Sequence, residues 1–268
     1  MSTHESISML RCPDCHHDLA SAPMAVGQNL SCRGCGRIFE SQHGILDMLE
    51  AGLSTPSTAQ RLMESSMVAR VYESRLWRRN PLFGLATGLA FRAEQQMIGR
   101  ALGDGAAPRI LDLACGPAIY SRPIAEAHPE GWVVGLDLSR AMLEHASRVA
   151  TTAGLRNLFL VHGTALDLPF QDGSFDGALC CGALHLFPDV PRVLCEVRRV
   201  IRPGGRLVLA VFRRGESALS RLGDRVRRRL YGVASFSPEE LTTLLHEARF
   251  PDVEIHHSRR LWLVVSGQ

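Results

Sequence analysis

A short apolar run that breaks into a glycine-containing turn constrains the fold of this chain more than any other segment. The stretch RILDLACGPA covers residues 109–118, and its isoleucine and leucines are typical of a buried strand. Gly116 permits a tight turn, and Pro117 suits the start of a helix expected at residues 120–127. Asp112, near the carboxyl end of the strand, is expected to face the crevice in which open α/β sheets bind their ligands.

Strands and helices are predicted to alternate after this turn. Strands are expected at residues 109–113, 132–137, 158–162, 175–180, 206–212, 253–257 and 261–265, and helices at 120–127, 140–153 and 190–200. Ser237 and Glu240 form an S-x-x-E capping box that predicts one more helix, with Pro238 at its first position. This order predicts an α/β fold with a doubly wound, mostly parallel seven-stranded sheet.

Four cysteines near the N-terminus have the spacing of a structural metal site. They are Cys12, Cys15, Cys32 and Cys35, in the pattern C-x2-C-x16-C-x2-C. Two tight turns at this spacing bring four thiolates around one tetrahedral zinc ion. No open coordination position is indicated, so the zinc is expected to contribute folding energy rather than Lewis acidity. The alternative ligands are His16, His17 and His43, which four suitably spaced cysteines would leave exposed to solvent.

The length of 268 residues and a hydrophobic content of 46% allow one large domain and a small second one. We expect a zinc ribbon at residues 1–50, a linker with an N-terminal helical lid at 51–104, and the main α/β domain at 105–268. No apolar run is long enough to span a bilayer, and the first twenty residues contain no signal-peptide core. The sequence therefore predicts a cytoplasmic protein.

The helical segments outside the main motifs each have two possible roles. Apolar stripes at residues 61–79 and 82–102 are typical of core packing, and the alternative is a lid in which Tyr72, Trp77 or Phe83 faces a substrate. A basic helical insertion is expected at 213–236, either as a solvated helix or as an anion-binding lid. All 30 basic residues of the chain are arginines, so a single arginine is weak evidence for a phosphate contact.

Further motifs follow the opening turn in a fixed order. Asp137 ends the second predicted strand, 25 residues after Asp112, where an acid can accept hydrogen bonds from both hydroxyls of a ribose. The motifs HGTALDLPF (162–170), FDGALCCGALHLF (175–187) and EVRRVIRPGGRLVLAV (196–211) come next. Ala114 and Ala118 stand where a dinucleotide pyrophosphate would need glycines for close backbone approach, which argues against a dinucleotide ligand.

Together these motifs resemble the class I, seven-strand S-adenosylmethionine-dependent methyltransferases, particularly the branch with small-molecule members. The resemblance covers residues 109–212 and rests on LDLACG, GLDLS, DLPF and RPGGRLVL. The cysteine-containing segment resembles the short zinc ribbons that precede some bacterial methyltransferases. The resemblance implies S-adenosylmethionine (SAM) as cofactor, bound by the domain at 105–268, beside a structural zinc ion.

The resemblance also implies roles for residues at the ends of four strands. Asp112, Ala114 and Gly116 would surround the methionine part of the cofactor, Asp137 and Leu138 its ribose, and Thr164 and Ala165 its adenine, while Cys181 and Gly182 would lie beneath the sulfonium. Tyr72 and Tyr120 are candidates to line the pocket, because an aromatic face attracts a sulfonium. The family often has an acid where this chain has Thr164, which can hydrogen-bond adenine without a charge.

Methyl transfer is an in-line displacement at an activated carbon, so alignment of the reactants supplies most of the acceleration. A base is needed only where the acceptor must lose a proton. His185, just beyond the fourth predicted strand, is the best-placed candidate, and packing is its alternative role.

The leading hypothesis is a methyltransferase acting on a small, hydrophobic or amphipathic metabolite. The main alternative is ring-nitrogen methylation of ribosomal RNA guanine, because a zinc ribbon also precedes this catalytic domain in ribosomal RNA guanine methyltransferases. Against nucleic acid, the predicted ribbon has few cationic residues, and the loop after the fourth strand lacks the Asn/Asp-Pro-Pro-aromatic motif that clamps exocyclic amines. A noncatalytic scaffold, in which the ribbon binds a partner protein, is a third hypothesis that Asp112 and Asp137 disfavour.

Overall fold

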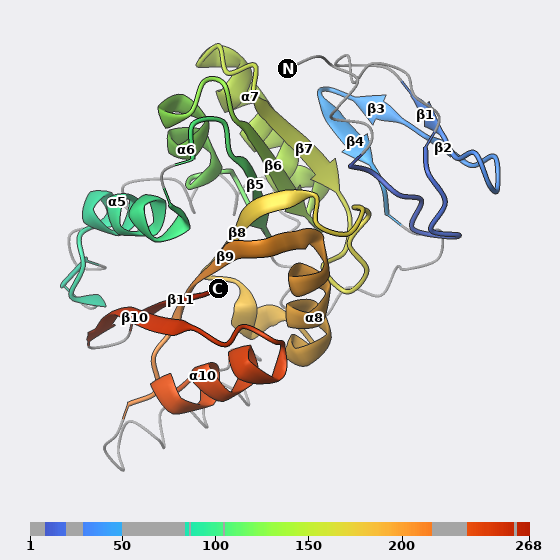
Figure 1. Cartoon of the computed structure of the whole chain (residues 1–268). Helices are drawn as coiled ribbons and strands as arrows, with labels where there is room; N and C mark the ends of the chain where they lie inside the picture. Colours follow the sequence, from blue (N-terminus) through green and yellow to red (C-terminus); the bar gives the residue numbers. More distant parts are fainter. Residues whose placement is uncertain are drawn as a thin grey trace.

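The computed structural model describes residues 9–19, 29–49, 84–85, 87–103, 105–215, 235–259 and 262–268. Within these residues a central sheet is built from β3 (Ser41–Gln42), β4 (Ile45–Asp47), β5 (Arg109–Leu113), β6 (Trp132–Asp137), β7 (Leu158–His162), β8 (Phe175–Cys181), β9 (Ile201–Phe212), β10 (Val253–Arg259) and β11 (Trp262–Gly267). The strand order is β10-β11-β9-β8-β5-β6-β7-β4-β3 (Figure 1). A separate two-stranded ladder joins β1 (Leu30–Ser31) to β2 (Ile38–Phe39).

The predicted doubly wound fold is confirmed. Strands β5 to β9 run parallel to one another, and β11 lies antiparallel between β9 and β10. Parallel strands are buried on both faces, which explains why the runs around Leu111 and Val134 are apolar. The sheet has more strands than expected, because β4 from the cysteine-containing segment pairs in parallel with β7, and β3 pairs with β4.

The helices begin and end close to the predicted positions in the main domain. They are α5 (Phe91–Leu102), α6 (Ser121–Ala127), α7 (Arg140–Thr152), the 3-10 helix η1 (Leu184–Leu186), α8 (Val190–Val200) and α10 (Pro238–Glu247). The capping box before α10 is confirmed: Ser237 Oγ accepts from the backbone N–H of Glu240, whose carboxylate accepts from that of Ser237.

The long helix predicted at 82–102 is interrupted. Gly84, Leu85 and Thr87 are helical, but a turn at Gly88, with φ of 72°, ends this segment, and α5 begins at Phe91. The apolar residues before the turn continued the helical spacing, but a left-handed backbone position ends such a pattern.

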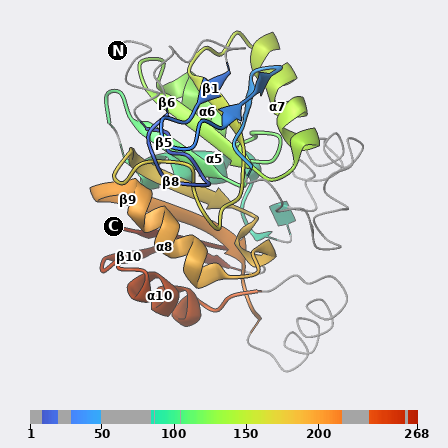
Figure 2. The ribbon, with the colours of Figure 1, turned by 90° about the vertical axis from the view of Figure 1, so that its right-hand side faces the viewer.

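Helices cover both faces of the sheet in three layers (Figure 1). Ile110 of β5 packs in the cluster that α5 and α6 share, whereas Leu111 packs in the cluster that contains α8 and α10. Figure 2 shows α8 and α10 side by side on this second face. The adjacent Cys180 and Cys181 fall in different clusters, which confirms that their thiols point to opposite faces.

The RPGG segment lies inside β9 rather than before it. Pairing shifts between β8 and β9 around Asp176, and Gly204 has a left-handed φ of 78°. A Cβ atom at Gly205 would approach the carbonyl oxygen of Asp176 to 2.5 Å, so only glycine fits this irregular stretch. None of the helices in the described ranges is both long and apolar enough to span a membrane.

Candidate functional site

The turn after β5 is shaped by three left-handed residues. Ala114, Gly116 and Ala118 have φ values of 53°, 53° and 59°. Left-handed backbone is unfavourable for alanine, so these two alanines occupy positions that glycine would adopt more easily. A Cβ atom added at Gly116 would meet nothing within 4 Å, which places open space above the middle of the turn.

Two acids at the carboxyl ends of neighbouring strands border this turn. Asp112 in β5 is buried and accepts a hydrogen bond from Ser121 Oγ at 2.5 Å. Asp137 ends β6 and accepts from the backbone N–H groups of Gly116 and Ser139, both at 2.7 Å. Asp137 therefore fixes the turn, and its two oxygens have acceptor capacity beyond these two bonds.

Both carboxyl groups resist ionisation in this setting. Burial raises the pKa of Asp112 to about 7, and the nearby charge of Asp137 raises it further against the lowering effect of the Ser121 hydrogen bond. Burial also raises the pKa of Asp137, while the N–H groups of Ser139 and Gly116 lower it. A cationic ligand above the turn would relieve the repulsion between the two acids.

The loop after β7 contains the residues predicted to contact adenine. Thr164 Oγ1 accepts from the backbone N–H of Leu166 at 3.2 Å, and Ala165 is buried. His162, the last residue of β7, reaches the carbonyl oxygen of Leu138 through Nε2 at 3.0 Å. Leu138, predicted at the ribose, thus contacts the end of the strand from which the loop with Thr164 and Ala165 continues.

An aromatic group lies past the carboxyl ends of β8 and β9. His185 in η1 is buried and packs edge-to-face on Phe212, with ring centroids 5.0 Å apart. Phe212 packs in the same way on Trp262 at 5.3 Å. Cys181 ends β8, and Gly182, with φ of 75°, donates its N–H to the carbonyl oxygen of Ala210 at 2.7 Å.

Sequence reasoning missed the buried acid that ties this aromatic group to the first turn. Glu94 in α5 is 2% exposed, and its Oε1 accepts from Tyr120 Oη at 2.7 Å and from Trp262 Nε1 at 3.0 Å. Tyr120, a predicted pocket residue, therefore lies against α5. The available signal was the spacing of Glu94 with Ile98 and Ala101, which share the buried face of the helix.

Several predicted residues lie outside the described part of the chain. They are Tyr72, Trp77, Phe83 and most of the basic insertion, residues 216–234. At the described ends of the insertion, Arg213 bridges to Phe236, and Arg214 Nη1 pairs with Glu240 Oε1.

The four predicted metal ligands come together. The thiol sulfurs of Cys12, Cys15, Cys32 and Cys35 all lie within 4.8 Å of one another. The Cys12–Cys35 and Cys15–Cys32 distances are 3.7 and 3.3 Å, against about 3.8 Å for neighbouring ligands of a tetrahedral zinc with Zn–S near 2.3 Å. The backbone N–H groups of Gly34 and Cys35 point at the Cys32 sulfur, as a thiolate requires. The donor set fits one zinc ion.

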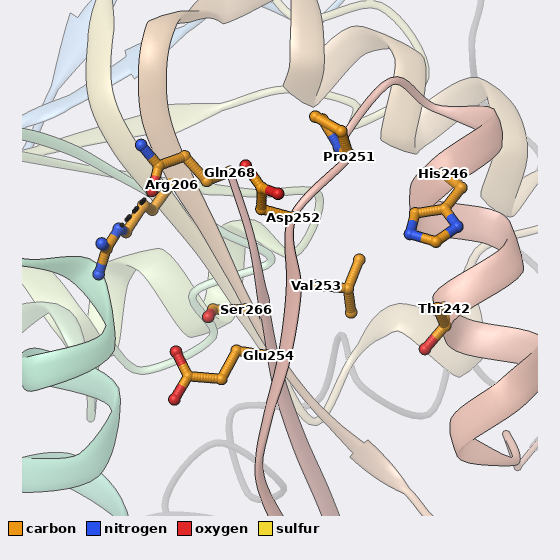
Figure 3. A pocket seen from close by; sticks show the side chains of 9 residues that line it. All are labelled: Arg206, Thr242, His246, Pro251, Asp252, Val253, Glu254, Ser266 and Gln268. Carbon is orange, nitrogen blue, oxygen red and sulfur yellow. Dashed lines mark hydrogen bonds between the residues drawn. The ribbon is translucent and has the colours of Figure 1, made fainter.

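A cavity of about 400 Å³ lies elsewhere (Figure 3). Arg206, Glu254 and Ser266 are among the residues that line it. Arg206 pairs with Gly177 near the start of β8, whereas Ala210 pairs with Cys181 at its end. The cavity is therefore at the end of the sheet opposite to the turn and the two acids.

The central part of the chain matches a known protein family. Residues 110–205 match the family described as "Methyltransferase domain". This region, about a third of the chain, is similar to the methyltransferase domains of that family. The match contains the turn, both acids, the loop after β7 and His185.

Curated relatives match the same central region. A demethylmenaquinone methyltransferase of Listeria monocytogenes is 46% identical over 99 residues, which cover 37% of this chain and 42% of the relative. The protein of the same name from Geobacillus kaustophilus is 45% identical over 101 residues, covering 37% of this chain and 43% of the relative. The chain thus spans about two fifths of the length of these relatives.

Solved structures match over a longer part of the chain. The YcgJ protein of Bacillus subtilis superposes with a TM-score of 0.56 and 25% identity, covering 62% of this chain and 71% of its own. A SAM-dependent methyltransferase of Thermotoga maritima, described as a possible histamine N-methyltransferase, gives a TM-score of 0.54 at 24% identity. It covers 74% of this chain and 98% of its own. At this identity the second match supports the fold alone.

Proposed function

We propose that the protein transfers a methyl group from SAM to a small, hydrophobic or amphipathic metabolite by in-line displacement. The observation that carries the proposal is the turn of residues 114–118 with Asp112 and Asp137 at its border, inside a region of the methyltransferase family. Bound SAM supplies an activated methyl group, so the chain needs to bind, orient and keep water out.

The cofactor residues have separate tasks in this proposal. Asp112 and Asp137 provide negative charge for a ligand that carries a sulfonium and an amino group. Asp137 also offers lone pairs to ribose hydroxyls while holding the N–H of Gly116. Thr164 and Ala165 border the adenine, and Leu138 follows Asp137 at the ribose. Cys181 and Gly182 lie at the end of β8, on the sulfonium side.

An apolar acceptor suits the aromatic residues near the carboxyl ends of β8 and β9. Phe212 is half-buried and lies between His185 and Trp262. The relatives named demethylmenaquinone methyltransferase support a small-molecule acceptor. Under this proposal His185 accepts a proton from the acceptor where one must leave.

The alternative of ribosomal RNA methylation lacks a supporting observation. Among the described residues of the ribbon, Arg11 forms an ion pair with Asp167 at 2.8 Å and Arg37 forms one with Asp14 at 2.5 Å. Arginines engaged in this way are poorly placed to bind phosphates, and phosphate contacts dominate nucleic-acid affinity.

Calorimetric titration with SAM tests the proposal. The unmutated protein should bind SAM, and Asp137→Ala should weaken binding by about 1 to 3 kcal/mol, as expected for loss of a partly buried hydrogen-bonding group. Asp252→Ala is the matched control, because Asp252 is an exposed acid at the opposite end of the sheet. Absence of SAM binding by the unmutated protein would contradict the proposed function.

A further inference from the structure

We infer that the N-terminal ribbon is part of the cofactor site, and that Arg11 is the residue through which it positions the loop after β7. The ribbon is residues 9–19 and 29–49, and the β7 loop is residues 163–171. The inference rests on the proposed function, because this loop is the one assigned to adenine. It gives the ribbon a role in cofactor binding, in addition to a structural role.

Arg11 contacts the β7 loop through both its side chain and its backbone. Its Nη2 donates to Asp167 Oδ1 at 2.8 Å, and its Nε donates to the carbonyl oxygen of Leu168 at 3.3 Å. The backbone N–H of Arg11 donates to the carbonyl oxygen of Pro169 at 3.1 Å. The side chains of the ion pair are only 14% and 21% exposed, so water screens this pair less than a surface pair.

Helix α8 holds the same loop from the other side. Glu196 accepts from the backbone N–H of Leu168 at 2.8 Å and lies 3.5 Å from Arg11 Nη2. Arg199 pairs with Glu196 at 2.7 Å and donates to the carbonyl oxygens of Leu168 and Phe170. Removing the Arg11 side chain deletes the contacts to Asp167 and to the carbonyl oxygen of Leu168. The backbone contacts between residues 9–11 and residues 169–171 remain, so the expected effect is confined to the part of the loop around Asp167 and Leu168.

A second connection runs through the sheet. Strand β4 of the ribbon pairs with β7, and Asp47 Oδ1 lies 3.1 Å from His162 Nδ1. The other ring nitrogen of His162 contacts the carbonyl oxygen of Leu138, next to Asp137. The backbone N–H of Met48 donates to the carbonyl oxygen of His162 at 2.8 Å. The ribbon therefore contacts His162, at the end of β7, as well as the β7 loop that follows it.

The position of Arg11 depends on the cysteine cluster. Arg11 precedes Cys12, whose backbone N–H donates to the carbonyl oxygen of His17 at 2.9 Å. Isolated bridges join Arg11 to Asp18 and Leu19 to Cys32, so both cysteine turns are linked around Arg11. A metal ion held by the four thiols would fix this arrangement, and cofactor and metal binding would then strengthen each other reciprocally.

The test compares two arginines of the same ribbon. Arg11→Gln should weaken SAM binding about tenfold or more, with the zinc content unchanged. Arg37→Gln is the matched control, because Arg37 bonds Asp14 and the carbonyl oxygen of Leu49 within the ribbon segment. Its SAM affinity should equal that of the unmutated protein. Arg11→Lys, which retains the charge but not the forked geometry, should recover part of the affinity.

The site of the effect is tested with a smaller ligand. 5′-Methylthioadenosine contains the adenine and ribose but lacks the amino acid part, so Arg11→Gln should weaken its binding by the same factor as for SAM. Asp167→Asn, on the loop side of the pair, should act like Arg11→Gln, and the double variant should lose little more. These readouts separate a positioned loop from a general loss of stability.

Each outcome is decisive. Arg11→Gln protein that retains zinc and binds SAM as tightly as the unmutated protein would overturn the inference. If Arg11→Gln lost its zinc, Asp167→Asn would decide, since Asp167 lies outside the ribbon: unchanged SAM binding would again overturn the inference. Failure of the unmutated protein to bind SAM would instead refute the proposed function, on which the inference depends.

Discussion

Replacing Asp112 by asparagine should make the ligand-free protein more stable and its SAM binding weaker. Asp112 is 1% exposed, and burial raises its pKa from the usual 3.8 to about 7. An acid whose pKa is raised on folding binds its proton more tightly in the folded state. Its ionisation therefore destabilises the fold as pH rises from about 4 to about 7, and the destabilisation is complete above pH 7.

The size of the effect follows from the pKa shift. One pKa unit corresponds to 1.36 kcal/mol, so the ionised Asp112 costs about 4 kcal/mol above pH 7 and almost nothing near pH 4. Asparagine retains an oxygen that can accept from Ser121 Oγ but carries no charge. The stability difference between Asp112→Asn and the unmutated protein should therefore grow by about 1.4 kcal/mol per pH unit between pH 4 and 7.

Urea unfolding followed by tryptophan fluorescence measures this difference at pH 5, 6, 7 and 8. Taking the difference between the two proteins removes the contribution of every titrating group that does not interact with Asp112. Asp252→Asn, which replaces an exposed acid at the opposite end of the sheet, is measured in parallel as the control. A pH-independent difference for Asp112→Asn, or a variant less stable than the unmutated protein at pH 8, would refute the reasoning.

Three shorter predictions concern Asp112, the turn after β5 and the cysteine cluster. SAM affinity should fall by up to about tenfold per pH unit below pH 7, because a cation favours ionised Asp112, and calorimetry of Asp112→Asn should show a flatter pH profile. Ala114→Gly should raise the free energy of unfolding by about 1 kcal/mol, because glycine relieves the left-handed strain. Ala150→Gly inside α7 is the control and should lower the free energy of unfolding by a similar amount. Urea unfolding of both variants at one pH measures the two changes. Elemental analysis should find one zinc per chain, and Cys32→Ser, which removes one of the four thiols, should lower that content; retention of full zinc by Cys32→Ser would mean that the thiol cluster is not the metal site.

Much of the main domain was predictable because its strands are short apolar runs bounded by turn residues. The strand at Arg109–Leu113 and the one at Trp132–Asp137 have the predicted ends, and the capping box places the start of α10. Residues close together in the sequence determine these strand ends and this helix start. The four thiols were predictable for the same reason, since their spacing alone brings two turns together.

Features that depend on distant contacts were not predictable. Strand β4 has three residues, and nothing in ILD indicates that it pairs with β7 more than a hundred positions away. Glu94 looks like an ordinary helix acid until Tyr120 and Trp262, from two other segments, are found to donate to it. The prediction for Asp137 described a ligand contact, while its bonds to the N–H groups of Gly116 and Ser139 depend on the shape of the turn.

The two alanines in the turn explain why this site suits a compact cation rather than a pyrophosphate. All three alternate positions of the turn are left-handed, and only the middle one, Gly116, is glycine; a Cβ atom there would meet open space. A ligand can therefore approach the backbone closely at Gly116, whereas Ala114 and Ala118 each carry a methyl group. Since two acids of raised pKa border that single opening, the ligand that relieves the most repulsion there is a small cationic group. The turn that limits close approach and the acids that favour a positive charge thus lie at the same place. In the proposed function, the sulfonium amino acid part of SAM suits both features.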